Sequence, residues 1–235
     1  MYQPIVFLPG LICDARLWRD IIDGLPDRIA PMVADLRLDD TIAAMAARTL
    51  AAAPPRFALA GLSMGGYVAL EIMRQAPERV THLALLDTSA RADTEERRET
   101  RSKGIEMISQ GKFIGVSRGL LPTLIAPHHL GTSLAEEVQA MSERVGPDVY
   151  VRQQKAIMGR IDSVPHLGAI AAPTLVGVGA LDKLIPPEMS DEMATRIPRA
   201  ELVTFPDAGH LPTMENPAPV VEAMRNWLSR QGAQA

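Results

Sequence analysis

The predicted elements of the chain are arranged around the motif Gly61-Leu62-Ser63-Met64-Gly65-Gly66. It follows an apolar run at 57–60 and precedes a helix-like pattern at 67–73, which predicts a strand, a sharp turn and a helix. A G-x-S-x-G pattern in that context is typical of a nucleophile elbow, a strained turn that lifts the serine hydroxyl clear of the sheet at a helix N-terminus. Side chains at Gly61 and Gly65 would collide where the turn folds back. Five-residue motifs also occur in ordinary strand-to-helix turns. The rest of the chain therefore has to show whether this motif is a nucleophile elbow.

Strand-like and helix-like segments alternate through much of the remaining sequence. Short apolar runs predict strands at 5–8, 29–34, 57 to Ser63, 80–86, 174–179 and 201–205. Helical spacing of apolar residues predicts helices at about 14–25, 41–53, from Ser63 to about 77, 187–197 and 218–230. Strands that alternate with helices of this length favour right-handed β-α-β units. The predicted fold class is therefore α/β, with a mostly parallel sheet of about six strands and helices on both faces.

The alternation stops between 89 and 165, where helical patterns and loops follow one another without a strand. The helical patterns fall at 93–110, 115–121, 133–145 and 148–158. We therefore expect an α/β core made of residues 1–88 and 166–235, with residues 89–165 inserted into it as a helical unit. The nine charged residues between 91 and 103 indicate a solvated helix face, with a partner-binding surface as the alternative.

Composition excludes several classes of protein. The 235 residues are 47% hydrophobic, enough for a sizeable core, and the formal net charge is only −4. No basic stripe is present to hold nucleic acid, and no apolar run is long enough to cross a membrane. The first residues lack the pattern of a signal peptide, so a cytoplasmic location is expected. Cys13 is the only cysteine and is expected to be a small buried apolar residue.

A serine hydroxyl becomes a good nucleophile only when a base takes its proton, so a functional elbow requires a histidine. His210 lies in a Gly/Pro-rich loop directly after the last predicted strand, where its ring can reach the carboxyl edge of the sheet. His82 and His166 are interpreted as structural, because they lie in a strand and in the approach to one. His128 and His129 lie in the insertion and could line a pocket.

The histidine in turn requires a carboxylate that fixes its tautomer. Asp182 follows the predicted strand that ends near Gly179, on the same edge of the sheet, and Asp87 is the alternative because it follows the strand after the nucleophile helix. The order Ser63, Asp182, His210 is one of three orders found in serine hydrolases. Each of these residues follows a predicted parallel strand, and that edge is where open α/β sheets bind ligands. We therefore predict that these three residues are catalytic.

In these motifs the chain resembles the α/β-hydrolase family over nearly its whole length, and its elbow is similar to those of small carboxylesterases and enol-lactonases. The resemblance implies an α/β-hydrolase fold in which the insertion is a cap over the sheet. It also implies an oxyanion hole made by the backbone N–H groups of Met64 and Leu11, which would stabilise developing negative charge. Many relatives have His-Gly in the loop after the first strand, whereas this chain has Pro9-Gly10.

The expected function is hydrolysis of a carboxylic ester, lactone or thioester of a small, mostly apolar substrate through an acyl-enzyme. Two alternatives stay open: specialised chemistry of the same triad, such as carbon–carbon bond hydrolysis or a cofactor-free lyase reaction, and a ligand-sensing protein without turnover. No zinc-ligand spacing, phosphate loop or dinucleotide fingerprint is present, so no cofactor or metal is expected. Arg152 and Arg160 could bind a substrate carboxylate or be structural. The apolar residues Leu120, Leu121, Leu124, Ile125, Met107 and Met158 could line the pocket or pack the cap onto the core.

Overall fold

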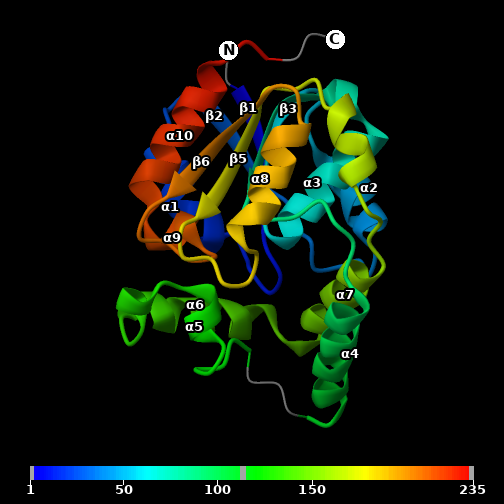
Figure 1. Ribbon diagram of the computed structural model, residues 1–235, viewed down its shortest axis with the longest axis vertical. Helices are drawn as coiled ribbons and strands as arrows, with labels where there is room; N and C mark the ends of the chain where they lie inside the picture. Colours follow the sequence, from blue (N-terminus) through cyan, green and yellow to red (C-terminus); the bar gives the residue numbers. More distant parts are fainter. Residues whose placement is uncertain (1–2, 112–114, 233–235) are drawn as a thin grey trace.

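The computed structural model describes residues 3–111 and 115–232, and it contains one parallel sheet with the strand order β2-β1-β3-β4-β5-β6 (Figure 1). The strands are β1 (Gln3–Leu8), β2 (Ile29–Val33), β3 (Phe57–Leu62), β4 (Val80–Leu86), β5 (Thr174–Gly179) and β6 (Ala200–Phe205). All five pairings are parallel. The predicted fold class is confirmed, and each predicted strand is present with small differences at its ends.

Helices cover both faces of the sheet. One face carries α1 (Arg16–Gly24) and α10 (Pro217–Ser229), and the other carries α2 (Ile42–Ala52), α3 (Met64–Gln75) and α8 (Pro187–Arg196) (Figure 1). Short helical turns complete this part of the chain: η1 (Pro77–Arg79), η3 (Val164–Ala169) and α9 (Pro212–Glu215). Parallel strands require such crossovers, and the helices bury both faces of the sheet.

Two hydrophobic clusters, one on each face, hold the helices to the sheet. Along β1, Ile5 and Phe7 belong to the cluster under α1 and α10, whereas Val6 and Leu8 belong to the cluster under α2 and α3. This alternation follows from the two-residue period of a strand. Every residue of β3 and β5 is buried, whereas the edge strands β2 and β6 are partly exposed. The carboxyl end of β3 is therefore fixed from both sides.

Four helices lie beyond the carboxyl end of the sheet (Figure 1). They are α4 (Glu95–Ser109), α5 (Leu121–Leu124), α6 (Ser133–Val145) and α7 (Pro147–Met158), and the turn η2 (Pro127–His129) follows α5. We call the described residues from 95 to 158, helices and connecting loops together, the α4–α7 segment. The predicted helix at 115–121 is wrong where the structure describes it, because Gly115 has a positive φ of 56° and the chain forms turns until Leu121. The division into a core and an inserted cap stays a prediction.

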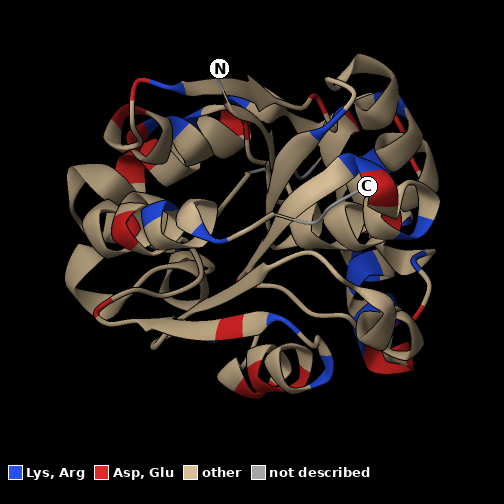
Figure 2. Ribbon diagram, turned by 90° about the horizontal axis from the view of Figure 1, so that it is seen from above, with Lys and Arg blue, Asp and Glu red and all other residues tan. Residues whose placement is uncertain are grey.

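Positions of Lys and Arg and positions of Asp and Glu are interspersed along the outer helices in the view from above (Figure 2). Within the described ranges, no helix is long and apolar enough to cross a membrane.

Candidate active site

The turn after β3 holds Ser63 in a strained conformation. Its φ is 55° and its ψ is −117°, a region that costs a non-glycine residue about 1–3 kcal/mol. The close packing of the surrounding backbone confines the turn to this conformation. A Cβ on Gly61 would overlap the backbone of Gly65, and one on Gly65 would overlap the carbonyl of Leu8. Thr88 Oγ1 also donates a hydrogen bond of 2.7 Å to the Ser63 carbonyl.

The structure brings the three predicted catalytic residues together. His210 Nε2 lies 2.9 Å from Ser63 Oγ, and His210 Nδ1 lies 2.8 Å from Asp182 Oδ2. Because a carboxylate only accepts, Nδ1 is assigned the proton, which leaves Nε2 as the acceptor for the serine hydroxyl. The Asp182 side chain has no exposed surface and that of His210 is 3% exposed. The arrangement can therefore move a proton from Ser63 to His210 away from bulk water.

Backbone donors hold Asp182 in place. Asp182 lies in the loop after β5, and its Oδ1 accepts hydrogen bonds from the backbone N–H groups of Leu184 at 2.8 Å and Ile185 at 3.0 Å. The other oxygen is left for His210. Each carboxylate oxygen thus has its own partner, which fixes the direction in which the carboxylate faces the imidazole.

Glu215 organises the loop that carries His210. Its carboxylate accepts hydrogen bonds from the N–H groups on either side of the histidine, Gly209 at 3.0 Å and Leu211 at 2.9 Å. It also accepts one from Ala126 of the α4–α7 segment at 2.6 Å. Glu215 is buried, so these bonds replace its hydration. The sequence reasoning missed this residue. The available signal was an acidic side chain five residues after the histidine, beside a loop whose N–H groups need acceptors.

A second buried carboxyl group lies beside the three residues. Asp87 Oδ1 accepts a hydrogen bond of 2.8 Å from Gly179 N–H, whereas Oδ2 has no hydrogen-bond partner among the described residues. Burial raises the pKa of Asp87 well above its ordinary value, and the neighbouring Asp182 carboxylate adds to the rise. A buried carboxyl group beside a second one favours its neutral form, so Asp87 is suited to stay protonated.

Asp87, Asp182 and His210 offer ligand atoms that lie within 4.8 Å of one another, close enough to be tested as a metal site. Both ring nitrogens of His210 already face other partners, Asp182 and Ser63. Binding a metal through His210 would therefore break one of these hydrogen bonds. The expectation that no metal is needed stays a prediction.

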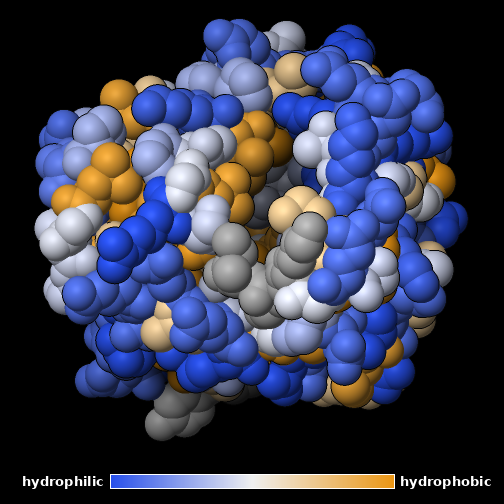
Figure 3. Space-filling view, turned by 90° about the horizontal axis from the view of Figure 1, so that it is seen from below, coloured by the Kyte–Doolittle hydropathy of each residue, from blue (hydrophilic) through white to orange (hydrophobic). Residues whose placement is uncertain are grey.

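A cavity of about 760 Å³ opens over Ser63 and His210, between the sheet and the α4–α7 segment. Its size suits a small molecule. In the view from below, hydrophobic side chains gather inside a hollow of this face and hydrophilic ones surround it (Figure 3). Apolar residues from the segment and the adjoining loops line it: Met107, Ile108, Val116, Leu120, Leu124, Val138, Met141, Ile157, Leu184 and Ile185.

Five of the six apolar residues singled out from the sequence divide between lining and core, and Met158 belongs to neither. Met107, Leu120 and Leu124 line the cavity, whereas Leu121 and Ile125 are buried in the cluster beneath. Residues in and next to α5 therefore share packing and pocket formation.

The two predicted oxyanion donors lie close to the nucleophile. Met64 is the first residue of α3, so its N–H is among those that lack a partner within the helix. Leu11 lines the same cavity as Ser63. A Cβ on Gly10 would be in ordinary contact with Ser63 Cβ at 3.5 Å, so the Pro9-Gly10 turn passes directly beside the serine. Their role in stabilising an oxyanion stays a prediction.

The other histidines have different surroundings. His82 Nε2 lies 2.9 Å from the Arg230 carbonyl, and its ring packs edge-on against Trp227. His166 lies in η3, away from the cavity lining. The rings of His128 and His129 pack against each other, 4.2 Å apart, and neither belongs to the lining.

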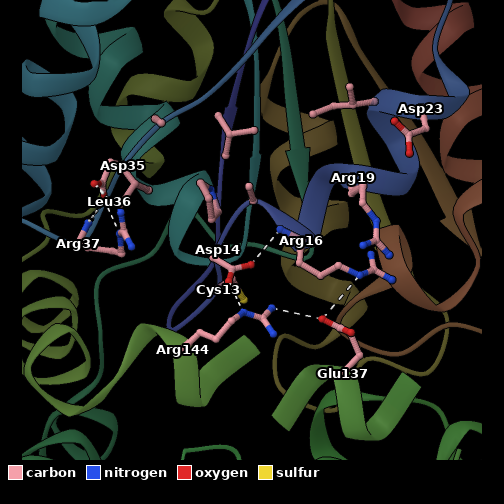
Figure 4. Close-up of a pocket in the computed structure, with 15 residues that line it drawn as sticks. Cys13, Asp14, Arg16, Arg19, Asp23, Asp35, Leu36, Arg37, Glu137 and Arg144 are labelled. Carbon is pink, nitrogen blue, oxygen red and sulfur yellow. Dashed lines mark hydrogen bonds and ion pairs between the residues drawn. The ribbon is translucent and has the colours of Figure 1, made fainter. Parts of the chain in front are cut away.

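A second cavity, of about 740 Å³, lies between α1, the end of β2 and α6 (Figure 4). Its charged groups pair across the gap: Arg144 Nε lies 3.0 Å from Asp14, and Arg16 lies 3.8 Å from Glu137. These ion pairs join the α4–α7 segment to α1. Cys13 lines both cavities, and burial raises the pKa of its thiol to about 12, so the thiol stays protonated at neutral pH.

Comparison with known proteins now gives the family. The family model described as "Alpha/beta hydrolase family" matches residues 5–223, and the chain belongs to this family of hydrolases. The chain is 26% identical to the pimeloyl-[acyl-carrier protein] methyl ester esterase of Nitrosomonas europaea, over 91% of this chain and 90% of that one.

Two solved structures share the fold. A thermophilic esterase from Thermogutta terrifontis superposes with a TM-score of 0.83 at 31% identity, over 96% of this chain and 89% of the esterase. The enol-lactonase from Burkholderia xenovorans LB400 superposes with a TM-score of 0.82 at 20% identity, over 98% and 92% of the two chains. At that identity the enol-lactonase supports the fold alone.

Proposed function

We propose that the protein is a serine hydrolase that cleaves a carboxylic ester, lactone or thioester of a small, mostly apolar substrate. The observation that carries the proposal is the continuous hydrogen-bonded series from Ser63 Oγ through His210 to Asp182, with distances of 2.9 and 2.8 Å. The apolar cavity above Ser63 supports a substrate with little charge. The names of two relatives, a methyl ester esterase and an esterase, agree with this chemistry.

In the proposed mechanism Ser63 Oγ attacks the acyl carbonyl carbon while His210 Nε2 takes the hydroxyl proton. The carbonyl oxygen becomes an oxyanion that the N–H groups of Met64 and Leu11 stabilise, together with the N-terminus of α3. Collapse of this intermediate breaks the bond to the alcohol or thiol, which leaves with the proton from His210. Asp182 stays ionised throughout and stabilises the imidazolium.

The second half of the reaction repeats these steps with water. His210 takes a proton from a water molecule, whose oxygen attacks the acyl-enzyme carbonyl, and then returns that proton to Ser63 Oγ. The products are the carboxylic acid and free enzyme, so one water is consumed for each ester bond broken.

The test is hydrolysis of p-nitrophenyl esters from acetate to octanoate by the wild type and by Ser63→Ala. Strong wild-type activity that the substitution abolishes supports the proposal, and the chain-length profile measures the cavity. A thermal unfolding curve controls for the fold of the variant. A folded wild type without ester activity would contradict the proposal and favour the specialised chemistry or the ligand-sensing role.

A further inference from the structure

We propose that Arg101 forms an anion subsite in the active-site cavity, and that the substrate is an ester or thioester whose mostly apolar chain also carries one carboxylate. The inference rests on the proposed function and names its substrate class. It starts from the charges on the cavity wall. Among the residues that the structure describes, the Arg, Lys, Asp and Glu side chains that line the cavity come from α4: Glu96, Arg97 and Arg101.

α4 directs these residues into the cavity by its helical period. Arg97, Arg101, Gly104 and Ile108 recur at intervals of three or four, so they share one face of the helix, and all four line the cavity. Glu96 belongs to the exposed surface of α4, where water screens its charge.

Beneath this wall, two guanidinium groups share one carboxylate. Arg101 Nε lies 2.7 Å from Asp93 Oδ2, and Arg160 Nη1 lies 2.8 Å from Asp93 Oδ1. The Asp93 side chain is 0% exposed, that of Arg160 is 4% exposed and that of Arg101 is 19% exposed. The cluster of these three residues therefore carries one positive charge in excess, largely out of contact with water.

The two arginines differ in how many partners already contact their guanidinium groups. Arg160 also donates to the carbonyls of Arg91 and Ile157, and its guanidinium lies over the ring of Tyr67, 4.2 Å from the centroid. Its surroundings are those of a structural residue.

Arg101 has fewer partners than Arg160, and it lines the cavity. It donates from Nε to Asp93 and from Nη1 to Gln154 Oε1 at 2.7 Å. A guanidinium carries five N–H groups, and hydrogen bonds to described residues use two of those of Arg101, so most of its Nη edge remains for a ligand. Arg101 is also the member of the cluster that lines the cavity.

Asp93 needs only one arginine to balance its charge, so the second arginine is not required to neutralise the cluster. Asp93 with Arg160 alone would be a balanced buried pair, whereas adding Arg101 leaves a charge that is costly without a counter-ion. A single carboxylate from the substrate would balance it and could accept two parallel hydrogen bonds from the guanidinium.

The cluster is connected to the helix that follows the nucleophile, and Arg101 and Ser63 line the same cavity. Tyr67 is one helical turn after Ser63 on α3, and it also lines the cavity. The guanidinium of Arg160 lies over the Tyr67 ring, and both Arg160 and Arg101 form ion pairs with Asp93. A bound carboxylate at Arg101 would therefore hold the apolar chain across the cavity with the ester carbonyl toward Ser63.

The test compares monomethyl esters of succinic, glutaric and adipic acids with uncharged methyl esters of equal chain length. We expect the wild type to prefer the anionic ester at one of these lengths by about 10- to 100-fold in kcat/KM, the range of one charged hydrogen bond. Arg101→Gln should remove that preference, measured as the ratio of kcat/KM for the anionic ester to kcat/KM for the uncharged ester of equal length. Arg98→Gln on the exposed side of α4 is the matched control, and Arg101→Lys should restore part of the preference.

A binding measurement separates this inference from the proposed function. In Ser63→Ala, which cannot turn over, calorimetry should detect the monomethyl ester that the wild type prefers, and Ser63→Ala/Arg101→Gln should bind it at least tenfold more weakly. Equal preference in wild type and Arg101→Gln, with uncharged esters still hydrolysed, would overturn the anion subsite and leave the proposed function standing. Absence of hydrolysis for every ester, with carboxylate binding lost in Arg101→Gln, would contradict only the hydrolase proposal.

Discussion

The carboxyl edge of the sheet and helix α4 are held by different interactions. All six residues of β3 are buried, and the turn that follows it is confined by backbone on both sides. In contrast, none of the fifteen residues of α4 is buried, and Arg101 ties the helix to neighbouring residues by ion pair and hydrogen bond. The sheet edge therefore fixes atoms at hydrogen-bonding distance, whereas α4 contributes charge and shape to the cavity. Substitutions in the two regions should have effects of different size and kind.

The largest effect is expected at the carboxylate that faces His210. Asp182→Asn should lower kcat by about 10⁴-fold, because an amide in that place favours the wrong imidazole tautomer. Asp87→Asn, the matched variant at the neighbouring carboxyl group, should retain kcat within about tenfold, because a neutral group already suits that position. The measurement is steady-state hydrolysis of p-nitrophenyl butyrate. A greater loss in Asp87→Asn would reverse the assignment of the acid.

The next effect is expected where the sheet edge meets the α4–α7 segment. Glu215→Gln should lower kcat by about 10- to 100-fold and also lower Tm, because hydrogen bonds to a charged group contribute about 1.5–3 kcal/mol. KM should change little, since Glu215 lies behind the histidine loop and does not line the cavity. Glu222→Gln, an exposed acidic residue of α10, is the control. Unchanged kcat in Glu215→Gln would show that the loop holds its shape without this carboxylate.

A smaller effect concerns pH. Because the folded protein raises the pKa of Asp87, it binds one more proton than the unfolded chain between the two pKa values, and stability falls as pH rises through that window. Asp87→Asn cannot ionise, so its Tm relative to the wild type should increase from pH 4.5 to pH 9. Asp182, His210 and Glu215 are the titratable groups nearby, and they are common to both proteins. A difference in Tm that is constant with pH would mean that Asp87 titrates normally.

The smallest effect is expected at the ion pair between Arg144 of α6 and Asp14, which precedes α1. Arg144 is about half exposed, so Arg144→Gln should destabilise the protein by less than about 1 kcal/mol, and by less still in 1 M salt. Denaturant unfolding at low and high salt measures this, with Arg118→Gln as an exposed control. A loss of several kcal/mol would mean that the segment depends on these pairs more than on its apolar contacts.

The same contrast explains what could be predicted from the sequence. The strands were predictable because buried parallel strands are short apolar runs, and Ser63, Asp182 and His210 were predictable because each follows such a run. The helix expected at 115–121 was wrong because the positive φ of Gly115 and the turns after it outweigh local helical spacing.

Two features of the site were not predicted from the sequence, because they depend mainly on distant contacts. Glu215 reaches backbone donors on both sides of His210 and in the α4–α7 segment. Arg101 and Arg160 meet at Asp93 only after α4 packs against α7. Neither contact leaves a periodic pattern in the chain.

The most direct test of the account is covalent labelling with a fluorophosphonate, followed by peptide mass spectrometry. We expect one adduct on Ser63 in the wild type, with labelling lost in Ser63→Ala and strongly slowed in His210→Gln. An adduct on another residue, or ester hydrolysis that persists in Ser63→Ala, would contradict the assignment of Ser63 as the nucleophile.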